Sequence, residues 1–373
     1  MIMRAAFLTE SLDKRNGWGR YSSSLIDALA KRRDVECFVA TTPSQTTYAQ
    51  GKFRLLPKLG EWSNLERWKK PLVLVRDVLS MRPHLRGFDV VHCLTERLLP
   101  LAYVLARGKH LIMTAHGTYA LSPNTRWYLR YLYKRMYRSA DQIICVSSHT
   151  EKRVASWVPE AKTFVINNGV DTQLADYPES PNSEGEYILT VGALKKRKGY
   201  HVTLAAFAAI CADFPKLRYI IVAGTADPEY KAMLLKEIER RRLTGRVILK
   251  ERISEAQLAN LFRHCLFFIL TPVETDQAFE GFGLVYLEAA LFGKPSVGVS
   301  SSGSAEAIIG EETGVLVPQE DVASTAKAMR RLLDDSDLRV IMGKRSAEYA
   351  ARSSWSKVAD QYVRVYQSVL SRA

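Results

Sequence analysis

The 373-residue sequence lacks the marks of several protein classes. Its five cysteines are odd in number, far apart and free of any C-x-x-C pair, so they predict neither a disulfide framework nor a zinc site. No run reaches the roughly 18 apolar residues that a membrane-spanning helix needs, and the apolar stretch at residues 1–9 is too short for a signal peptide. We therefore expect a cytoplasmic protein, in solution or peripheral on the cytoplasmic face of the membrane.

Length and charge indicate two domains with different partners. A chain of this length exceeds the size at which one hydrophobic core keeps growing, and 47% apolar with 25% charged residues is typical of packed globular proteins. Residues 1–170 hold 27 Lys and Arg against 13 Asp and Glu, whereas residues 171–373 hold 26 of each class. The whole net charge of +14 thus lies in the first half and predicts an anionic partner there.

Short β-branched runs alternate with helical patterns in both halves. Because parallel strands need crossover connections, this alternation predicts an α/β fold of two Rossmann-like doubly wound parallel sheets facing across a cleft, with ligands at the carboxyl ends of the strands. We expect an N-terminal domain over 1–170, an acidic, proline-containing linker over 171–186 and a C-terminal domain over 187–353. The predicted strands cover residues 5–8, 35–40, 89–93, 111–114, 142–146 and 163–166, then 187–191, 218–223, 246–250, 265–271, 295–299 and 314–317.

The stretch 280–290 carries the strongest chemical signal. Helix-forming residues follow Gly283, so a helix is expected to begin there and to present its first amides to an anion. Gly281 and Gly283 allow the backbone to approach a ligand closely. Glu280 and Glu288 are expected beside this anion seat rather than in it, where they would accept hydrogen bonds from hydroxyl groups. A ligand that carries phosphates between two polyols is a nucleotide sugar.

A basic run supplies the cations that a diphosphate needs. Lys195-Lys196-Arg197-Lys198 follows the first predicted strand of the C-terminal half and precedes a helix. A solvated loop is the alternative interpretation of such a run. Its place at the carboxyl end of a strand, facing the predicted cleft, favours phosphate binding by Arg197 and Lys198.

As a set, these motifs resemble the family 4 retaining glycosyltransferases of the GT-B fold over essentially the whole chain. Ala193 stands where members commonly carry an arginine, a role that we expect Arg197 to take, and Asn16 replaces one glycine of an N-terminal glycine loop. The motifs that carry the resemblance are Glu280 and Glu288 with seven residues between them, Arg197-Lys198-Gly199, Asp89-Val90-Val91-His92, Ala115-His116-Gly117, Gly17 and Gly19, Asn168-Gly169-Val170-Asp171, and Gly303–Glu306.

The resemblance implies roles for the matched residues. In such enzymes the residue matching Glu280 binds the donor sugar, the residue matching Glu288 binds the ribose, and the lysine matching Lys198 steadies the diphosphate. The final segment, 354–373, is implied to return and pack on the N-terminal domain. The further donor-binding positions are Gly17, Gly19, Arg252, Ile253, Gly281, Phe282, Gly283 and Leu284.

The chemistry that we expect is metal-independent transfer with retention of configuration. Arg197, Lys198 and the helix amides are placed to stabilise the charge on the leaving diphosphate. His116 ends a predicted strand; a structural histidine is the alternative, but its match to the family's His-Gly element favours a catalytic role. The Asp-x-Asp sequence at 335–337 is expected to cap a helix, so no metal and no other cofactor is predicted.

Two segments rich in aromatic and basic residues indicate a surface for the acceptor. In the first, cations recur every four residues and share one helical stripe with tyrosines alongside. Helices that pack on the sheet with merely solvated charges are the alternative to docking on an anionic membrane or holding a lipid-linked, acidic acceptor. The cationic stripe consists of Arg126, Arg130, Lys134 and Arg138, and the second segment carries Trp62, Leu65, Trp68 and Leu72.

These observations predict a hexosyltransferase. It would move a hexose from a UDP- or GDP-hexose to a glycan or lipid-linked acceptor in cell-surface polysaccharide or glycolipid synthesis. The long loop before Glu280 resembles that of mannosyltransferases, which favours GDP-mannose. A nucleotide-sugar epimerase of the same fold is an alternative, as is a non-catalytic protein that binds sugar nucleotides or nucleic acid, although no nucleic-acid reading motif is present.

Overall fold

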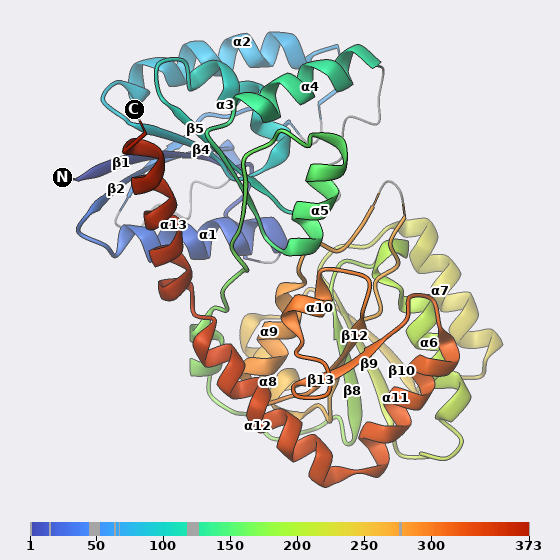
Figure 1. Ribbon diagram of the computed structural model, residues 1–373. Coiled ribbons are helices and arrows are strands. Elements are labelled where there is room, and N and C mark those ends of the chain that lie inside the picture. Colours follow the sequence, from blue (N-terminus) through green and yellow to red (C-terminus); the bar gives the residue numbers. More distant parts are fainter. Residues whose placement is uncertain are drawn as a thin grey trace. The chain divides into compact units, whose positions relative to one another are not determined.

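The computed structural model describes residues 2–14, 16–44, 53–62, 65–66, 68–117, 127–275 and 278–372. The chain divides into two compact units (Figure 1). Unit 1 comprises Met1–Asn168 and Trp355–Ala373, and unit 2 comprises Gly169–Ser354. Each unit is a parallel sheet with helices packed against it, which confirms the predicted α/β class and its two doubly wound sheets.

The sheet of unit 1 has the strand order β3-β2-β1-β4-β5-β6-β7, and all neighbouring pairs are parallel. The order reverses beside β1, because the chain moves outward to β3 and then returns to β4. The central strands are buried on both faces, which explains their continuous apolar runs. The strands are β1 (Met3–Leu8), β2 (Val35–Thr41), β3 (Arg54–Pro57), β4 (Val90–Cys93), β5 (His110–Ala115), β6 (Gln142–Cys145) and β7 (Thr163–Val165).

Helices connect these strands and cover the sheet (Figure 1). The first helix begins at Gly17 because the Asn16 side chain accepts a hydrogen bond from the Gly19 N–H at 2.8 Å and so caps the helix. The described helices of unit 1 are α1 (Gly17–Ala30), α2 (Lys70–Met81), α3 (Leu99–Leu105), α4 (Trp127–Ser139), α5 (Ser148–Trp157) and α13 (Trp355–Leu370), with the 3₁₀ turns η2 (Arg82–Leu85) and η3 (Glu96–Leu98).

A buried hydrogen-bond network fastens α13, the last helix of the chain, to the core of unit 1. The Tyr362 hydroxyl oxygen lies 2.6 Å from that of Tyr21, which lies 3.1 Å from Thr114 Oγ1. His92 Nδ1 lies 2.7 Å from the Tyr366 hydroxyl, and His92 Nε2 lies 2.9 Å from Thr114 Oγ1. All five side chains are buried, where an unpaired polar atom would be costly. The network therefore fixes the position of α13 within unit 1.

The sheet of unit 2 has the order β10-β9-β8-β11-β12-β13, again with all neighbouring pairs parallel. The order reverses beside β8, so the carboxyl ends of β8 and β11 meet where the chain changes direction across the sheet. Ligands of open α/β sheets bind at such a point. The strands are β8 (Tyr187–Val191), β9 (Arg218–Ala223), β10 (Val247–Glu251), β11 (Phe268–Ile269), β12 (Ser296–Val299) and β13 (Gly314–Val317).

Several helices of unit 2 begin at a side-chain cap. Asp335 accepts a hydrogen bond from the Leu338 N–H at 2.8 Å, which confirms the capping role predicted for the Asp-x-Asp sequence. The helices of unit 2 are α6 (Tyr200–Ile210), α7 (Pro228–Arg240), α8 (Glu255–His264), α9 (Leu284–Leu291), α10 (Ser304–Ala307), α11 (Val322–Asp334) and α12 (Ser336–Arg352), with the 3₁₀ turns η5 (Thr172–Asp176) and η6 (Lys196–Lys198). Over the described part of the chain, no helix combines the length and apolar character that crossing a membrane requires.

Candidate active site

The basic loop after β8 is held in one conformation by close packing at Gly199. This residue follows η6 with a positive φ of 70°. A Cβ atom there would collide with the carbonyl oxygen of Thr271, so a side chain fits only if the loop moves. The carbonyl of Arg197 accepts a hydrogen bond from the Val273 N–H at 2.8 Å. These contacts tie the basic loop to the segment that follows β11.

Glu280 forms ion pairs with two of the four cations of this loop. Its Oε2 lies 2.7 Å from Lys198 Nζ and 2.8 Å from Arg197 Nη1. The side chains of Glu280 and Lys198 are each 10% exposed, and that of Arg197 is 32% exposed. The sequence predicts this carboxylate beside the anion seat, but the structure has it directly on the two cations. The physical reason is that charges nearly removed from water are stable only when paired. We call these three residues the ion-pair cluster.

The ion-pair cluster keeps its carboxylate ionised. Burial by itself would raise the pKa of Glu280, but the charges of Lys198 and Arg197 and their hydrogen bonds outweigh burial and lower this pKa to about 2. Burial lowers the pKa of Lys198, and the neighbouring carboxylate opposes that shift. Glu280 is therefore an anion throughout the physiological pH range.

The N-terminus of α9 lies next to the ion-pair cluster. Gly283 caps this helix with a φ of 82°, and the Cγ of Glu280 would lie 3.9 Å from a Cβ built on Gly283. A Cβ on Gly303 would collide with the Gly281 carbonyl, and the Gly303 N–H donates to the Glu280 carbonyl at 3.0 Å, so this turn is tightly packed. The helix provides no acceptor for its first amides, those of Leu284 and Val285, whereas the next amide, that of Tyr286, donates to the Gly283 carbonyl at 3.1 Å. Cations and helix amides thus meet at one place, which is suitable for a diphosphate.

The other predicted donor-binding residues of unit 2 lie outside the ion-pair cluster. Phe282 is 2% exposed, and Glu288, the fifth residue of α9, is 4% exposed. Leu284 is the first residue of α9. Arg252 and Ile253 follow β10, an edge strand that β9 separates from β8, and Arg252 has a positive φ of 55°.

In unit 1, His116 follows β5 directly and has a defined tautomer. Its Nε2 lies 2.8 Å from the Leu94 carbonyl oxygen, which can only accept, so Nε2 carries the proton and Nδ1 keeps a lone pair. Tyr21 packs edge-on against the imidazole, with 4.3 Å between ring centroids. Burial lowers the pKa of His116 and the hydrogen bond to Leu94 raises it. Burial has the larger effect, so the pKa is about 4. The neutral ring can accept a hydrogen bond from a hydroxyl group.

Glu96 is a candidate residue that the sequence motifs miss. It begins η3 after β4, the strand next to β5, and its Oε1 accepts a hydrogen bond from the His116 N–H at 2.6 Å. It is 3% exposed, and burial raises its pKa to about 7. No motif contains this glutamate; the available signal is its position shortly after a predicted strand, at the carboxyl edge where His116 also lies.

The two glycines of the N-terminal loop have different environments. A Cβ on Gly19 would collide with the backbone of Asp13, whereas a Cβ on Gly17 would meet no atom within 4 Å. Close packing within unit 1 therefore explains Gly19. Gly17 is the first residue of α1.

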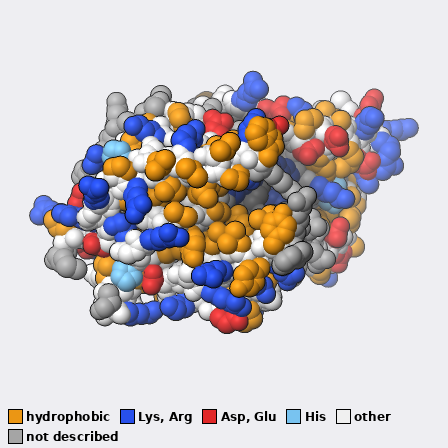
Figure 2. Space-filling view, turned by 90° about the horizontal axis from the view of Figure 1, so that it is seen from above, with side chains coloured by type: hydrophobic (Ala, Val, Ile, Leu, Met, Phe, Trp, Pro, Cys, Tyr) orange, Lys and Arg blue, Asp and Glu red, His pale blue; other side chains and the backbone are white. Residues whose placement is uncertain are grey.

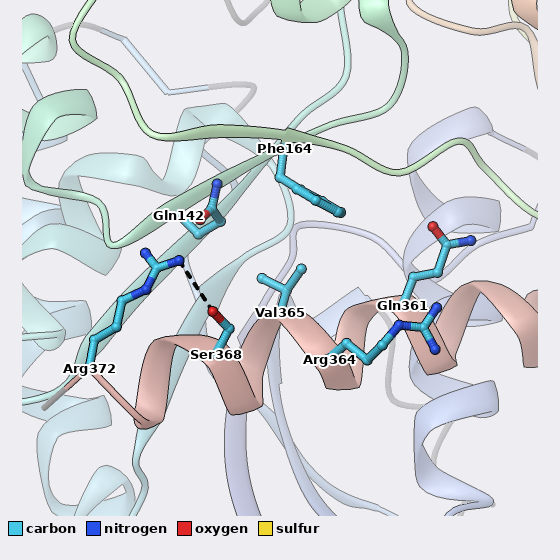
Figure 3. A pocket seen from close by; sticks show the side chains of 7 residues that line it. All are labelled: Gln142, Phe164, Gln361, Arg364, Val365, Ser368 and Arg372. Atoms are coloured by element: carbon cyan, nitrogen blue, oxygen red, sulfur yellow. Dashed lines mark hydrogen bonds between the residues drawn. The ribbon is translucent and has the colours of Figure 1, made fainter.

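An open cavity of about 280 Å³ lies in unit 1 between α13 and the strands β6 and β7 (Figure 3). Two arginines reach its rim, and Arg372 donates a hydrogen bond to the Ser368 hydroxyl at 3.2 Å. The residues predicted to bind or activate a donor are not among those that line it, so we assign this cavity no part in the reaction. Its lining consists of Gln142, Phe164, Gln361, Arg364, Val365, Ser368 and Arg372.

One face of unit 1, formed by α2 and α4, exposes many apolar side chains. Seen from above, hydrophobic side chains gather in the middle of this face, and Lys and Arg side chains surround them (Figure 2). We call it the α2–α4 face; α3 packs against both helices. Its exposed apolar residues are Trp68 just before α2, Leu72, Val75 and Leu79 on α2, and Tyr128, Tyr131 and Leu132 on α4.

Not all residues of the two segments predicted to form this surface are exposed. Trp62 does not belong to the surface: it is 4% exposed, and its indole N–H donates to a buried aspartate of α2 at 2.9 Å. Arg130 is exposed, Lys134 is half-buried, and the exposed Arg138 is ion-paired to a glutamate. Arg126 lies outside the described residues.

Two family profiles match consecutive parts of the chain. The profile of Glycosyltransferase Family 4 matches residues 15–174, and that of glycosyl transferases group 1 matches residues 174–349. All but the last six residues of the first match fall on unit 1, and the second match falls on unit 2.

Individual proteins are similar over different shares of the chain. An uncharacterized glycosyltransferase of Methanocaldococcus jannaschii is 23% identical over 354 residues, 92% of this chain and 93% of the relative. A phosphatidyl-myo-inositol mannosyltransferase of Mycolicibacterium smegmatis is 30% identical over 208 residues, 55% of this chain and 51% of the relative, so the chain matches about half of that protein. The structure of Anabaena HepE in complex with UDP and glucose is 20% identical, with a TM-score of 0.78 over 98% of this chain and 100% of that one. This likeness shows the GT-B fold that the sequence predicts.

Proposed function

The chain belongs to the nucleotide-sugar-dependent glycosyltransferases, with a Glycosyltransferase Family 4 domain followed by a group 1 domain, and we propose that it transfers a hexose from a UDP- or GDP-hexose to a glycan or lipid-linked acceptor. The observation that supports this most is the meeting of Arg197, Lys198 and the start of α9. Negative charge grows on the nucleoside diphosphate as its bond to the sugar breaks, and fixed cations and amides stabilise it. The reaction would retain the anomeric configuration and need no metal.

Each residue near the ion-pair cluster has a part in this proposal. Lys198 and Arg197 hold the diphosphate together with the amides of Gly283 and Leu284, because all of these groups donate to anionic oxygens. Carboxylates only accept, so Glu280 and Glu288 are suited to hydroxyl groups, Glu280 on the hexose and Glu288 on the ribose.

We propose that unit 1 contributes His116 to catalysis. A neutral His116 with a lone pair on Nδ1 can accept a hydrogen bond from a sugar hydroxyl and orient the ring for attack. We propose that the backbone at Gly17 and Gly19 approaches the donor, and that Arg252 and Ile253 border the base.

Two observations on relatives support different donors. HepE was solved with UDP and glucose, whereas the Mycolicibacterium smegmatis relative is a mannosyltransferase. The loop before Glu280 favours the second, so we propose GDP-mannose ahead of a UDP-hexose.

The acceptor proposal rests on the α2–α4 face. Apolar side chains ringed by cations are suited to an interface with anionic lipid, because apolar groups enter the headgroup boundary while cations pair with phosphates. The net charge of +14 in residues 1–170 also favours binding to anionic lipid. We therefore propose that unit 1 docks on the cytoplasmic face of an anionic membrane and receives a lipid-linked acceptor in glycolipid or cell-surface polysaccharide synthesis.

A panel of nucleotide sugars tests the transfer reaction. The protein is incubated with each donor, with and without a membrane-lipid extract as acceptor, and release of nucleoside diphosphate is followed with and without EDTA. We expect one donor to be consumed faster with the extract, at a rate that EDTA leaves unchanged. Isomerised nucleotide sugar would favour an epimerase, and donor binding without consumption would favour a non-catalytic protein; either result overturns the proposal.

A further inference from the structure

One oxygen of Glu280 occupies both cations that the diphosphate would need. Oε2 lies within 2.8 Å of Lys198 Nζ and of Arg197 Nη1, and a phosphate oxygen held by the same N–H donors would have to take its place. A carboxylate that stayed there would face the phosphate at close range, and like charges repel strongly in a poorly hydrated site. A diphosphate therefore competes with Glu280 for Lys198 and Arg197.

We infer that Glu280 is the resident counter-ion of the phosphate site, which the donor displaces and which helps to expel the nucleoside diphosphate after transfer. The inference rests on the proposed function and deepens it, because it makes one residue responsible for the preference for donor over product. The ion pairs with Glu280 also explain how two cations are stable at a nearly buried site when no ligand is bound.

The displaced carboxylate has different fates with donor and with product. An intact donor carries hexose hydroxyl groups next to its phosphates, and these can donate hydrogen bonds to Glu280 once it leaves the cations. The nucleoside diphosphate has lost the hexose, so Glu280 has no hydroxyl partner from the ligand and competes for Lys198 and Arg197 again. In the ion-pair cluster the pKa of Glu280 is about 2, so the carboxylate that a ligand has to displace is an anion at every pH near neutrality.

Binding measurements on a charge-removing variant test the inference. Calorimetric titration gives the affinities of wild type and Glu280→Gln for UDP, GDP and inorganic pyrophosphate, and for the matching nucleotide sugars without acceptor. We expect Glu280→Gln to bind the nucleoside diphosphates and pyrophosphate about 10- to 100-fold more tightly, the range of one charge-assisted hydrogen bond. Affinity for nucleotide sugars should rise less, because the variant also loses its charged acceptor for the hexose.

Two further variants make the result interpretable. Glu311→Gln removes the same charge from an exposed ion pair of unit 2 with Arg331, and it should leave all affinities unchanged. Glu280→Asp keeps the charge, but its side chain is one methylene shorter and reaches the two cations less well. This variant should therefore also bind nucleoside diphosphates and pyrophosphate more tightly, and it provides the test if Glu280→Gln does not fold.

The outcomes separate this inference from the proposed function. If wild type binds a nucleoside diphosphate and neither Glu280 variant binds it more tightly, the counter-ion role is wrong while the donor site stands. If neither wild type nor variants bind any nucleotide or pyrophosphate, the proposed function itself is wrong.

Discussion

The backbone N–H of His116 donates a hydrogen bond to Oε1 of Glu96, with 2.6 Å between the two heavy atoms. The two residues follow neighbouring strands, β5 and β4, so the carboxyl edge of the sheet brings them together across 20 positions of sequence. Glu96 thereby helps to fix the turn from which His116 presents its imidazole. The pair links the stability of unit 1 to pH, because burial raises the pKa of Glu96 to about 7.

The pH dependence of unfolding tests this link. A carboxyl whose pKa is higher in the folded state than the usual 4.5 contributes stability below pH 4.5 and loses it as pH rises through about 7. We expect wild type to lose about 2 to 3 kcal/mol relative to Glu96→Gln across this window. All six tryptophans belong to unit 1, so urea unfolding followed by tryptophan fluorescence reports on this unit alone. The exposed Glu66→Gln serves as control; parallel curves for Glu96→Gln and wild type would show that the carboxyl has no such link.

Loss of Lys198 should impair transfer more than loss of its neighbours. Lys198 is nearly buried at the proposed phosphate site, whereas Lys196 in the same turn is exposed. We expect Lys198→Ala to lower kcat/KM for the nucleotide sugar about 100-fold or more, the scale of one group that stabilises a developing anion. Lys196→Ala, measured in the same assay, should stay within a few-fold of wild type. Equal effects of the two substitutions would mean that the loop contributes only general charge.

His116 should matter for turnover and not for the fold. We expect His116→Ala to lower kcat about 100-fold, since it removes an oriented hydrogen-bond acceptor. Because the pKa of His116 is about 4, the ratio of the wild-type to the variant rate should stay constant from about pH 6 to about pH 9. His110→Ala, at the opposite end of β5, is the matched control. Wild-type turnover in His116→Ala would remove this histidine from the mechanism.

Alanine substitutions at two glycines with positive φ distinguish the cost of backbone strain from the cost of a steric clash. Gly245 and Gly199 have φ of 80° and 70°, but a Cβ on Gly245 meets no atom within 4 Å, while one on Gly199 meets the Thr271 carbonyl. We expect Gly245→Ala to cost about 1 kcal/mol and Gly199→Ala clearly more, with loss of nucleotide binding as the basic loop moves. Scanning calorimetry and nucleotide titration measure both effects. Similar losses for the two variants would contradict the account of Gly199.

The α2–α4 face should bind anionic membranes through its apolar residues. We expect wild type to float with vesicles that contain phosphatidylglycerol at moderate salt, and the double substitution Leu72→Glu and Leu79→Glu to abolish flotation. Both leucines are 69% exposed, so the fold should tolerate the change. Leu235→Glu on α7 of unit 2, 46% exposed in wild type, should float normally. Failure of wild type to float would rule out this docking surface.

Much of the fold could be predicted because buried parallel strands appear in a sequence as short, continuous apolar runs. The run 187–191 coincides with β8, and 218–223 coincides with β9. Arg54–Pro57 escaped prediction because β3 is a half-exposed edge strand that ends in proline. The run 265–271 pairs as a strand only at Phe268–Ile269, since apolar composition reports burial and not hydrogen bonding.

The candidate site was predictable where its residues are close in sequence and unpredictable where the sheet assembles it. Gly283 predicts the start of a helix, and Glu280, three residues earlier, places a carboxylate beside it. The position of the Glu280 carboxylate on Lys198 depends on how two loops pack, which no local pattern encodes. The role of Glu96 depends on β4 lying next to β5, and a single sequence does not give strand order. Trp62 lies in an aromatic and basic segment of the kind that surfaces carry. Its indole N–H nevertheless donates a hydrogen bond to Asp77 of α2 inside the core.

A crystal structure with the nucleoside diphosphate that binds most tightly would show whether Lys198 holds the phosphates and whether Glu280 gives way to them. We expect diphosphate oxygens within hydrogen-bond distance of Lys198 Nζ and of the first amides of α9, with the Glu280 carboxylate moved off both cations. A diphosphate bound away from Lys198, or one bound while Glu280 keeps both ion pairs, would contradict this expectation.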